Sequence, residues 1–120
     1  MRFREGKEGV TSVLDAVPDD NARSGRSSWP RGPKKHIVEA SGRAETLCWS
    51  VERKDGGRGV GFTGAHFHYN FGNDGFRKLV LNAVAWTAGL EIPKNGLVTH
   101  RPDEVELDAN QDFKKPGKKK

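Results

Sequence analysis

Residues 55–89, DGGRGVGFTGAHFHYNFGNDGFRKLVLNAVAWTAG, constrain the fold most, because three local patterns follow one another there without a break. A glycine-rich strand pattern comes first, a loop with two histidines follows, and an amphipathic helix pattern completes the stretch. A strand that leads through a short loop into a helix is the repeating unit of α/β proteins, which keep their ligands at such loops. We therefore expect an α/β fold with the histidines at the end of a strand.

A β-hairpin is predicted at the start of this stretch. In residues 45–53 large apolar side chains, beginning with Leu47, occupy every second position, and this period of two is typical of a strand. The Asp-Gly-Gly sequence at 55–57 supplies a tight turn, and residues 58–63 return as the second strand. Glycines weaken that second strand, so we expect a helix or another backbone to pack closely against it.

A helix is predicted over residues 75–88. Asn73 or Asp74 suits its N-cap, and Gly89 suits the left-handed position after its end. Arg77 and other polar residues are expected on its solvent side. Apolar side chains recur at spacings of three and four and form one wide face, which comprises Phe76, Leu79, Val80, Ala83, Trp86 and Leu90.

The rest of the chain carries less information on the fold. A further strand is predicted over residues 10–17, and residues 18–35 are expected to form a loop that Trp29 anchors. With 120 residues, of which 33% are hydrophobic, the chain is about one small domain with a core concentrated in a few segments. We expect residues 1–96 to form the folded part and residues 97–120 to be a polar, disordered, lysine-rich tail.

Charge and cysteine content limit the classes of partner. The formal charge is +5 and the pI is about 9.6, yet five lysines lie within residues 114–120, and without them basic and acidic residues are equal in number. The basic character therefore describes the tail, and no specific nucleic-acid partner is expected. Cys48 is the only cysteine, which excludes an internal disulfide and a cysteine-rich zinc site, and we expect it to be a small buried side chain.

No segment approaches the roughly eighteen apolar residues that a membrane span requires, and the N-terminus lacks the apolar run of a secretory signal. We therefore expect no membrane partner and, by default, a cytoplasmic location. The sequence gives no indication of an oligomeric state.

Residues 64–73, GAHFHYNFGN, are the candidate functional site. His66 and His68 are two apart, so an extended backbone would point both imidazoles to the same side and turn Phe67 toward the core. Gly64 would leave room for a ligand to approach the backbone. The polar side chains of the loop that could bind a ligand are Tyr69, Asn70 and Asn73, although Asn73 also suits the helix cap.

Three interpretations of the histidine pair stay open. As ligands of a divalent metal cofactor such as zinc or iron, His66 and His68 supply two donors, and a third has to come from elsewhere. As a general acid or base, one of them needs a substrate proton within hydrogen-bond reach. In the third interpretation Phe67, Tyr69 and Phe71 pack the loop, and the histidines have no chemical role.

The residues that carry these patterns also resemble a known family. The sequence GRGVGFTGAHFHYNFGNDGFRKLVLNAVAWTAGLEIPKNG is similar to the closing segment of the ThuA-like domain, named for trehalose utilisation: a GRGF-type strand, a Gly-His or His-x-His loop, and then FR-x-L-x-x-NA-x-x-W-x-AG. The similarity is close over residues 45–96 and weaker over residues 1–17. It implies the C-terminal strands and final helix of a flavodoxin-like, class I glutamine amidotransferase-like three-layer sandwich, with the first half of the domain missing.

The resemblance also implies a function. ThuA-like domains are linked to sugar metabolism, so a small-molecule carbohydrate is the expected ligand, bound or transformed at the loop with His66 and His68. In amidotransferases of that superfamily a histidine after a late strand activates an earlier cysteine, and here no cysteine precedes His66 except Cys48 in a strand. The alternative is a noncatalytic carbohydrate- or protein-binding module that uses the loop aromatics. A partial domain would also leave sheet edges uncovered, and we expect poor solubility in isolation.

Overall fold

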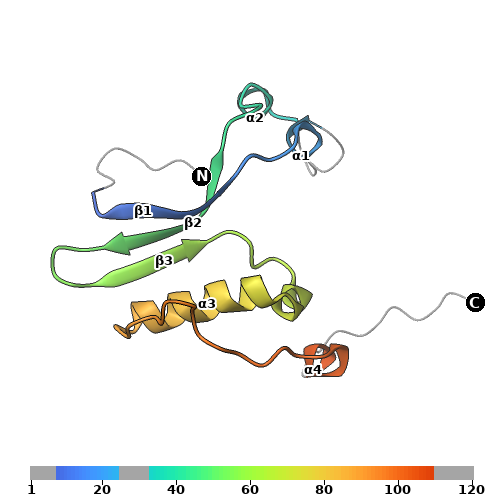
Figure 1. Cartoon of the computed structure of the whole chain (residues 1–120). Coiled ribbons are helices and arrows are strands. Elements are labelled where there is room, and N and C mark those ends of the chain that lie inside the picture. Colours follow the sequence, from blue (N-terminus) through green and yellow to red (C-terminus); the bar gives the residue numbers. More distant parts are fainter. Residues whose placement is uncertain (1–7, 25–32, 110–120) are drawn as a thin grey trace, which may run out of the picture.

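The computed structural model describes residues 8–24 and 33–109. In these two ranges helices accompany a small antiparallel sheet (Figure 1), which agrees with the expected α/β class at its broadest level. The elements in chain order are β1 (Val10–Ala16), α1 (Asp20–Ser24), α2 (Lys35–Val38), β2 (Glu45–Glu52), β3 (Arg58–Phe62), the 3-10 helix η2 (His68–Gly72), α3 (Asp74–Thr87) and α4 (Glu104–Asp108).

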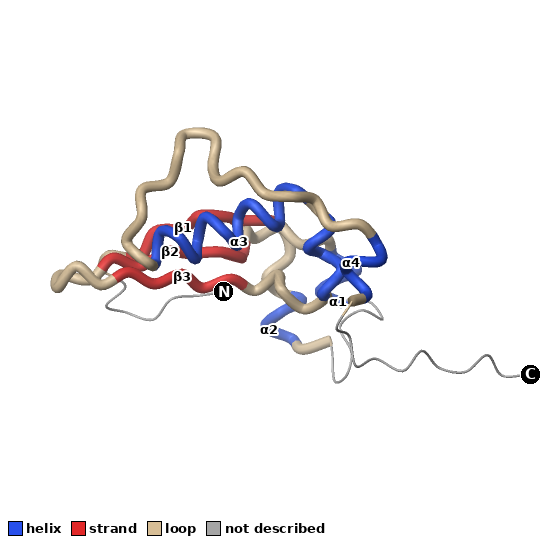
Figure 2. Tube along the Cα trace, turned by 90° about the horizontal axis from the view of Figure 1, so that it is seen from below, coloured by secondary structure: helices blue, strands red, loops and turns tan. Residues whose placement is uncertain are grey.

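The sheet has the strand order β1-β2-β3, and both strand pairs are antiparallel. The predicted hairpin of β2 and β3 is confirmed. In its turn Gly56 has a φ of 81°, which favours glycine, and the Asp55 carboxylate accepts a hydrogen bond from the Gly57 N–H at 2.9 Å. The predicted first strand is confirmed as β1. α3 lies along one face of this sheet (Figure 2).

The two faces of the hairpin differ. Cys48, Val60 and Phe62 point toward α3. On the opposite face Trp49 is directly paired with Gly61, and a Cβ at position 61 would collide with the indole. The close neighbour of this strand glycine is therefore a side chain, whereas we expected a helix or another backbone.

The predicted helix is confirmed as α3. Asn73 is its N-cap, with the Asn73 side chain accepting a hydrogen bond from the Phe76 N–H at 3.0 Å. Gly89 follows the helix with a φ of 87°, and the Leu90 N–H reaches back to the carbonyl of Ala85 at 3.0 Å. Both ends of the helix are therefore fixed by the residues that the sequence indicates.

The core is small. Within the described ranges the buried apolar residues are Ala40, Cys48 and Ala85. Cys48 is 1% exposed, as expected, and burial raises the pKa of its thiol. On α3, Val84 remains 62% exposed. The hairpin therefore covers only part of the apolar surface that the helix presents.

Arg77 connects three segments of the chain. The sequence suggested a position on the solvent side of α3, but its side chain is buried, with 6% of the residue exposed. Its guanidinium donates to Asp74 Oδ1 at 2.7 Å, to the carbonyl of Phe71 at 2.8 Å and to Thr99 Oγ1 at 3.1 Å. Each of the three guanidinium nitrogens has an acceptor, which is why burial of this cation is tolerated.

Residues 18–35 do not form the single loop that we expected, because the described part contains α1 and starts α2. Arg23 of α1 is buried and donates to the carbonyl of Arg43 at 2.6 Å, and it lies 3.3 Å from Glu45 Oε1. Arg43 also pairs with Glu45. This charged cluster attaches α1 to the start of β2. Trp29, the expected anchor, lies outside the described residues.

A short helix also forms in the region expected to be a polar tail. α4 begins with a capping box in which Asp103 and Glu106 each accept from the backbone N–H of the other. His100 Nε2 lies 2.8 Å from Glu106 Oε2, and Leu107 approaches Gly72 of η2. The lysine-rich end, 110–120, lies outside the described residues.

In the part of the chain that the structure covers, no helix combines the length and the apolar character needed to cross a membrane.

We predict that Arg77→Lys destabilises the protein by about 2 kcal/mol, because lysine keeps the charge but cannot reach three divergent acceptors, and a buried cation with fewer hydrogen bonds is costly. Chemical denaturation measures this change. Arg53→Lys is the matched control, since Arg53 is exposed and pairs with Asp55 at the surface, and it should stay within about 0.5 kcal/mol of the wild type. Equal stabilities for the two variants would contradict the structural role of Arg77.

Glu45 predicts a specific pH dependence. The hydrogen bond from Arg43, with a smaller contribution from Arg23, lowers the pKa of Glu45 from 4.5 to about 2. A carboxyl whose pKa is lower in the folded state stabilises the fold above its unfolded pKa, and this contribution is lost as the pH falls from about 4.5 toward about 2. We expect Glu45→Gln to lose less stability over that range than the wild type. Unfolding at a series of pH values tests this, and Glu39→Gln, at an exposed i,i+4 pair with Lys35, should keep the wild-type profile.

Candidate functional site

The loop between β3 and α3 is not extended. A turn at Ala65 and His66 precedes η2, which begins at His68, so the side-chain alternation of a strand does not apply. His66 and His68 are both exposed, but the expectation that strand geometry aligns them is wrong. Phe67 does not turn toward the core, since it is 50% exposed.

The aromatic side chains of the loop form two groups. In the outer group Phe67 and Tyr69 are nearly parallel, with ring centroids 5.3 Å apart and an interplanar angle of 13°, and His66 meets Phe67 edge-on at 4.5 Å. Tyr69 is 65% exposed. Phe71 belongs to the inner, partly buried group and meets Phe76 of α3 edge-on at 5.0 Å.

The inner group attaches the loop to the hairpin. The ring centroids of Phe76 and of Phe62 in β3 are 5.5 Å apart. On the loop side, the ring centroids of His68 and Phe71 are 5.8 Å apart. His68 therefore lies between the two aromatic groups, whereas His66 belongs to the outer one. The outer group, His66, Phe67 and Tyr69, is from here on called the aromatic platform.

The remaining predicted ligand-binding residues have structural partners. A Cβ at Gly64 would collide with the ring of Phe62, so the glycine lets the loop pass its own strand and does not keep space for a ligand. Asn70 Nδ2 donates to the Gly64 carbonyl at 3.3 Å. Asn73 caps α3. Of the predicted contact residues outside the histidine pair, only Tyr69 presents its side chain freely to solvent.

Neither imidazole has a hydrogen-bond or ion-pair partner within the described residues. Among residues 8–24 and 33–109 there is also no group of three histidine, cysteine, aspartate or glutamate residues close enough to hold a metal ion. The described residues therefore supply two imidazole donors and no carboxylate to orient them. What the arrangement offers chemically is an exposed aromatic surface with imidazole nitrogens beside it.

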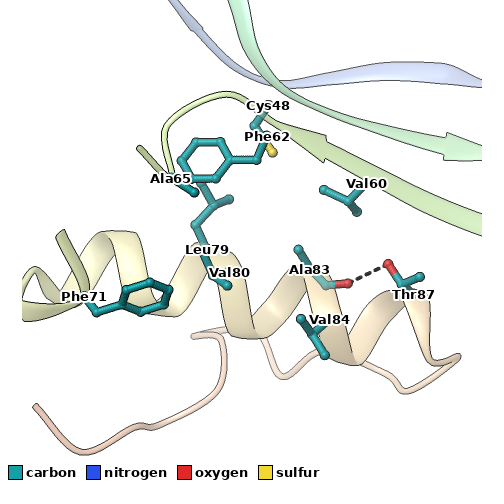
Figure 3. A pocket seen from close by; sticks show the side chains of 10 residues that line it. All are labelled: Cys48, Val60, Phe62, Ala65, Phe71, Leu79, Val80, Ala83, Val84 and Thr87. Carbon is teal, nitrogen blue, oxygen red and sulfur yellow. Dashed lines mark hydrogen bonds between the residues drawn. The ribbon is translucent and has the colours of Figure 1, made fainter. Parts of the chain in front are cut away.

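An apolar groove of about 400 Å³ opens beside this loop, between the hairpin and α3 (Figure 3). Sequence reasoning did not find it. The available signal was the width of the apolar face of α3, which exceeds what two strands can cover. Its lining is almost entirely hydrocarbon and includes Val60, Phe62, Leu79, Val80, Ala83 and Val84.

Comparisons with known proteins do not identify a family. No protein-family model matches the chain, and no significant match is found among curated proteins or solved structures. Function has to be argued from the site.

Proposed function

We propose that the chain is the C-terminal part of a ThuA-like domain and that its loop, residues 64–73, binds a carbohydrate. The observation that carries the proposal is the exposed, nearly parallel pair of Phe67 and Tyr69 beside His66. Two large rings on a loop tip cost free energy when they stay hydrated, so their exposure favours a contact function.

The chemistry of the aromatic platform suits a sugar. A pyranose ring has an apolar face of C–H groups and a rim of hydroxyls, and a flat aromatic surface buries the first while leaving the second accessible. The His66 imidazole can donate one hydrogen bond and accept another, as a hydroxyl requires. The Tyr69 hydroxyl adds a second such group at the other end of the platform.

The resemblance of residues 45–96 to the ThuA-like closing segment supports the same ligand class. The hairpin, the histidine loop and the capped helix occur in the order that the resemblance implies. We propose a flavodoxin-like three-layer sandwich for the intact domain. β2, β3 and α3 would form its final hairpin and helix.

Binding is better supported than catalysis. A general acid or base is usually oriented by a hydrogen bond, and no described residue forms a hydrogen bond or ion pair with either imidazole. In a catalytic version of the proposal His66 and His68 would be the acid–base pair or two metal ligands, with further groups supplied from outside the described residues. The noncatalytic version needs only the aromatic platform.

We predict that Tyr69→Ala weakens sugar binding about fivefold, because an exposed stacking ring contributes on the order of 1 kcal/mol. NMR titration of the purified chain with neutral monosaccharides and disaccharides, trehalose included, measures this. Tyr69→Phe is the matched variant, since it keeps the ring and removes only the hydroxyl, and it should bind the sugar more tightly than Tyr69→Ala does. Equal affinities of the alanine variant and the wild type would remove the platform from the proposal.

We predict that His66→Ala weakens sugar binding about fivefold through loss of one hydrogen bond, while the free energy of unfolding changes by less than about 0.5 kcal/mol. The same titration and a denaturation curve measure the two effects. Sugar turnover by the wild type that His66→Ala abolishes would favour the catalytic version. Unchanged binding and no turnover would leave the imidazole without a role.

A further inference from the structure

We propose that two copies of this chain associate through β3 and α3, with the β3 strands paired antiparallel about a two-fold axis at Val60. The inference goes beyond the proposed sugar site and does not depend on it. β3 is the border strand of the sheet, and within the described residues it pairs only with β2. Figure 2 shows this border on the side away from the loop that follows α3.

The backbone of β3 offers a regular row of unpaired groups. The Arg53 N–H donates to Gly57 O and the Thr63 N–H to Leu47 O, so these pairs are hydrogen-bonded pairs of the β2–β3 ladder. Because such pairs alternate, Gly59 and Gly61 also point their N–H and C=O groups at β2. The N–H and C=O groups of the other three strand residues, Arg58, Val60 and Phe62, therefore point out of the sheet.

β3 is complementary to its own copy in one register. A two-fold axis at Val60 sets Val60 opposite Val60 of the second copy and Arg58 opposite its Phe62. These are the residues whose backbone groups point outward, so each of them forms both ladder hydrogen bonds. Gly59 then faces the second Gly61, and all larger side chains point to the α3 side. If the register of the two β3 strands shifted by two residues, one of the three residues Arg58, Val60 and Phe62 would have no partner in the other strand.

The positions of the two α3 helices are also compatible with a two-fold axis at Val60. α3 lies beneath β2 and β3, since Cys48 and Val60 face Leu79 and Ala83 across the groove. With strands about 4.8 Å apart, the axis lies about 2.4 Å beyond β3, which places each α3 about 5 Å from it. The two helices would then be about 10 Å apart, the spacing of packed helices. The groove between them would be closed by the second copy.

The centre of the surface that this pairing buries is apolar, and the charged residue Arg58 lies at each end of the paired strands, where its guanidinium is held over the Trp86 ring. Val80, Val84 and Thr87 line the open side of the groove, and Val84 is 62% exposed. A second copy presents the same apolar row, so no charged group has to be desolvated at the centre of the contact.

The opposite border of the sheet is protected, which argues against association there. β1 has register shifts between Ser12 and Leu14 and between Leu14 and Asp15, and Asp15 carries a charge. Bulges and charges are the usual devices that prevent strand addition. β3 has a regular register, and Arg58 is its only charged residue.

The size of the contact indicates a reversible dimer. α3 has 14 residues and is about 21 Å long, and β3 has 5 residues and is about 17 Å long. Measured perpendicular to the sheet, one strand layer with the helix packed on it is about 15 Å thick. Two such faces, each about 20 Å by 15 Å, bury roughly 600 Å² in total, which is below the range of stable specific interfaces. Dissociation at micromolar concentrations is therefore expected.

Sedimentation velocity of the full chain from about 5 to about 500 μM tests the proposal. We expect a concentration-dependent dimer for the wild type and at least tenfold weaker association for Val84→Lys, which places two like charges at the axis. Val98→Lys is the matched control, because Val98 is 99% exposed on the segment after α3 and lies outside the interface, and it should dimerise as the wild type does.

Hydrogen exchange at the two ends of that concentration range provides a second measurement. The amides of Val60 and Phe62 should gain protection on dimerisation, whereas those of Gly59 and Gly61, already bonded to β2, should change little. A wild type that is monomeric throughout would overturn the proposal. Large aggregates that Val84→Lys does not reduce, or a dimer without protection at Val60, would overturn it equally.

Discussion

The guanidinium of Arg77 determines where the candidate site lies. It holds the end of η2 through the Phe71 carbonyl, the first turn of α3 through Asp74, and the segment after the helix through Thr99. The histidine loop has neither a strand ladder nor a long helix of its own to fix it. Its position relative to the hairpin therefore depends on this cation and on the contact between Phe71 and Phe76. Neither the Arg77 guanidinium nor the contact between Phe71 and Phe76 is exposed. Both therefore influence a ligand at the aromatic platform only indirectly, by positioning the loop.

Short-range patterns predicted the hairpin, β1 and α3 with its cap, because each is decided by residues close in sequence. Long-range contacts decided what the patterns missed. The burial of Arg77 requires Thr99, which is far from it in the chain, and Arg23 is buried only because Arg43 and Glu45 come to it. The alignment of His66 and His68 failed for another reason: alternation assumes a strand, and the backbone there forms a turn and a 3-10 helix. The placement of the histidines in a loop between strand and helix was predictable, and their orientation was not.

The two proposals use different parts of the same unit. The aromatic platform lies at the end of β3, and the proposed dimer contact lies along its edge. The proposed dimer contact arises because a sheet of three strands does not cover a helix with such a wide apolar face. Under the proposal of a three-layer domain, further strands would cover the rest of that face, and under the proposal of a dimer a second copy would. Either way, the small number of buried residues means that the stability of this unit depends on what covers α3.

The antiparallel pairing of β1 with β2 has a consequence for the order in which the sheet assembles. The hairpin and α3 form from neighbouring residues, whereas pairing β1 closes a connection of roughly thirty residues, at an entropic cost of about 3 kcal/mol. Within the described residues, that connection is shortened by the charged cluster of Arg23, Arg43 and Glu45 and by the hydrogen bond from the Ser41 hydroxyl to Asp20. We therefore expect the N-terminal strand to join after the hairpin and its helix have formed.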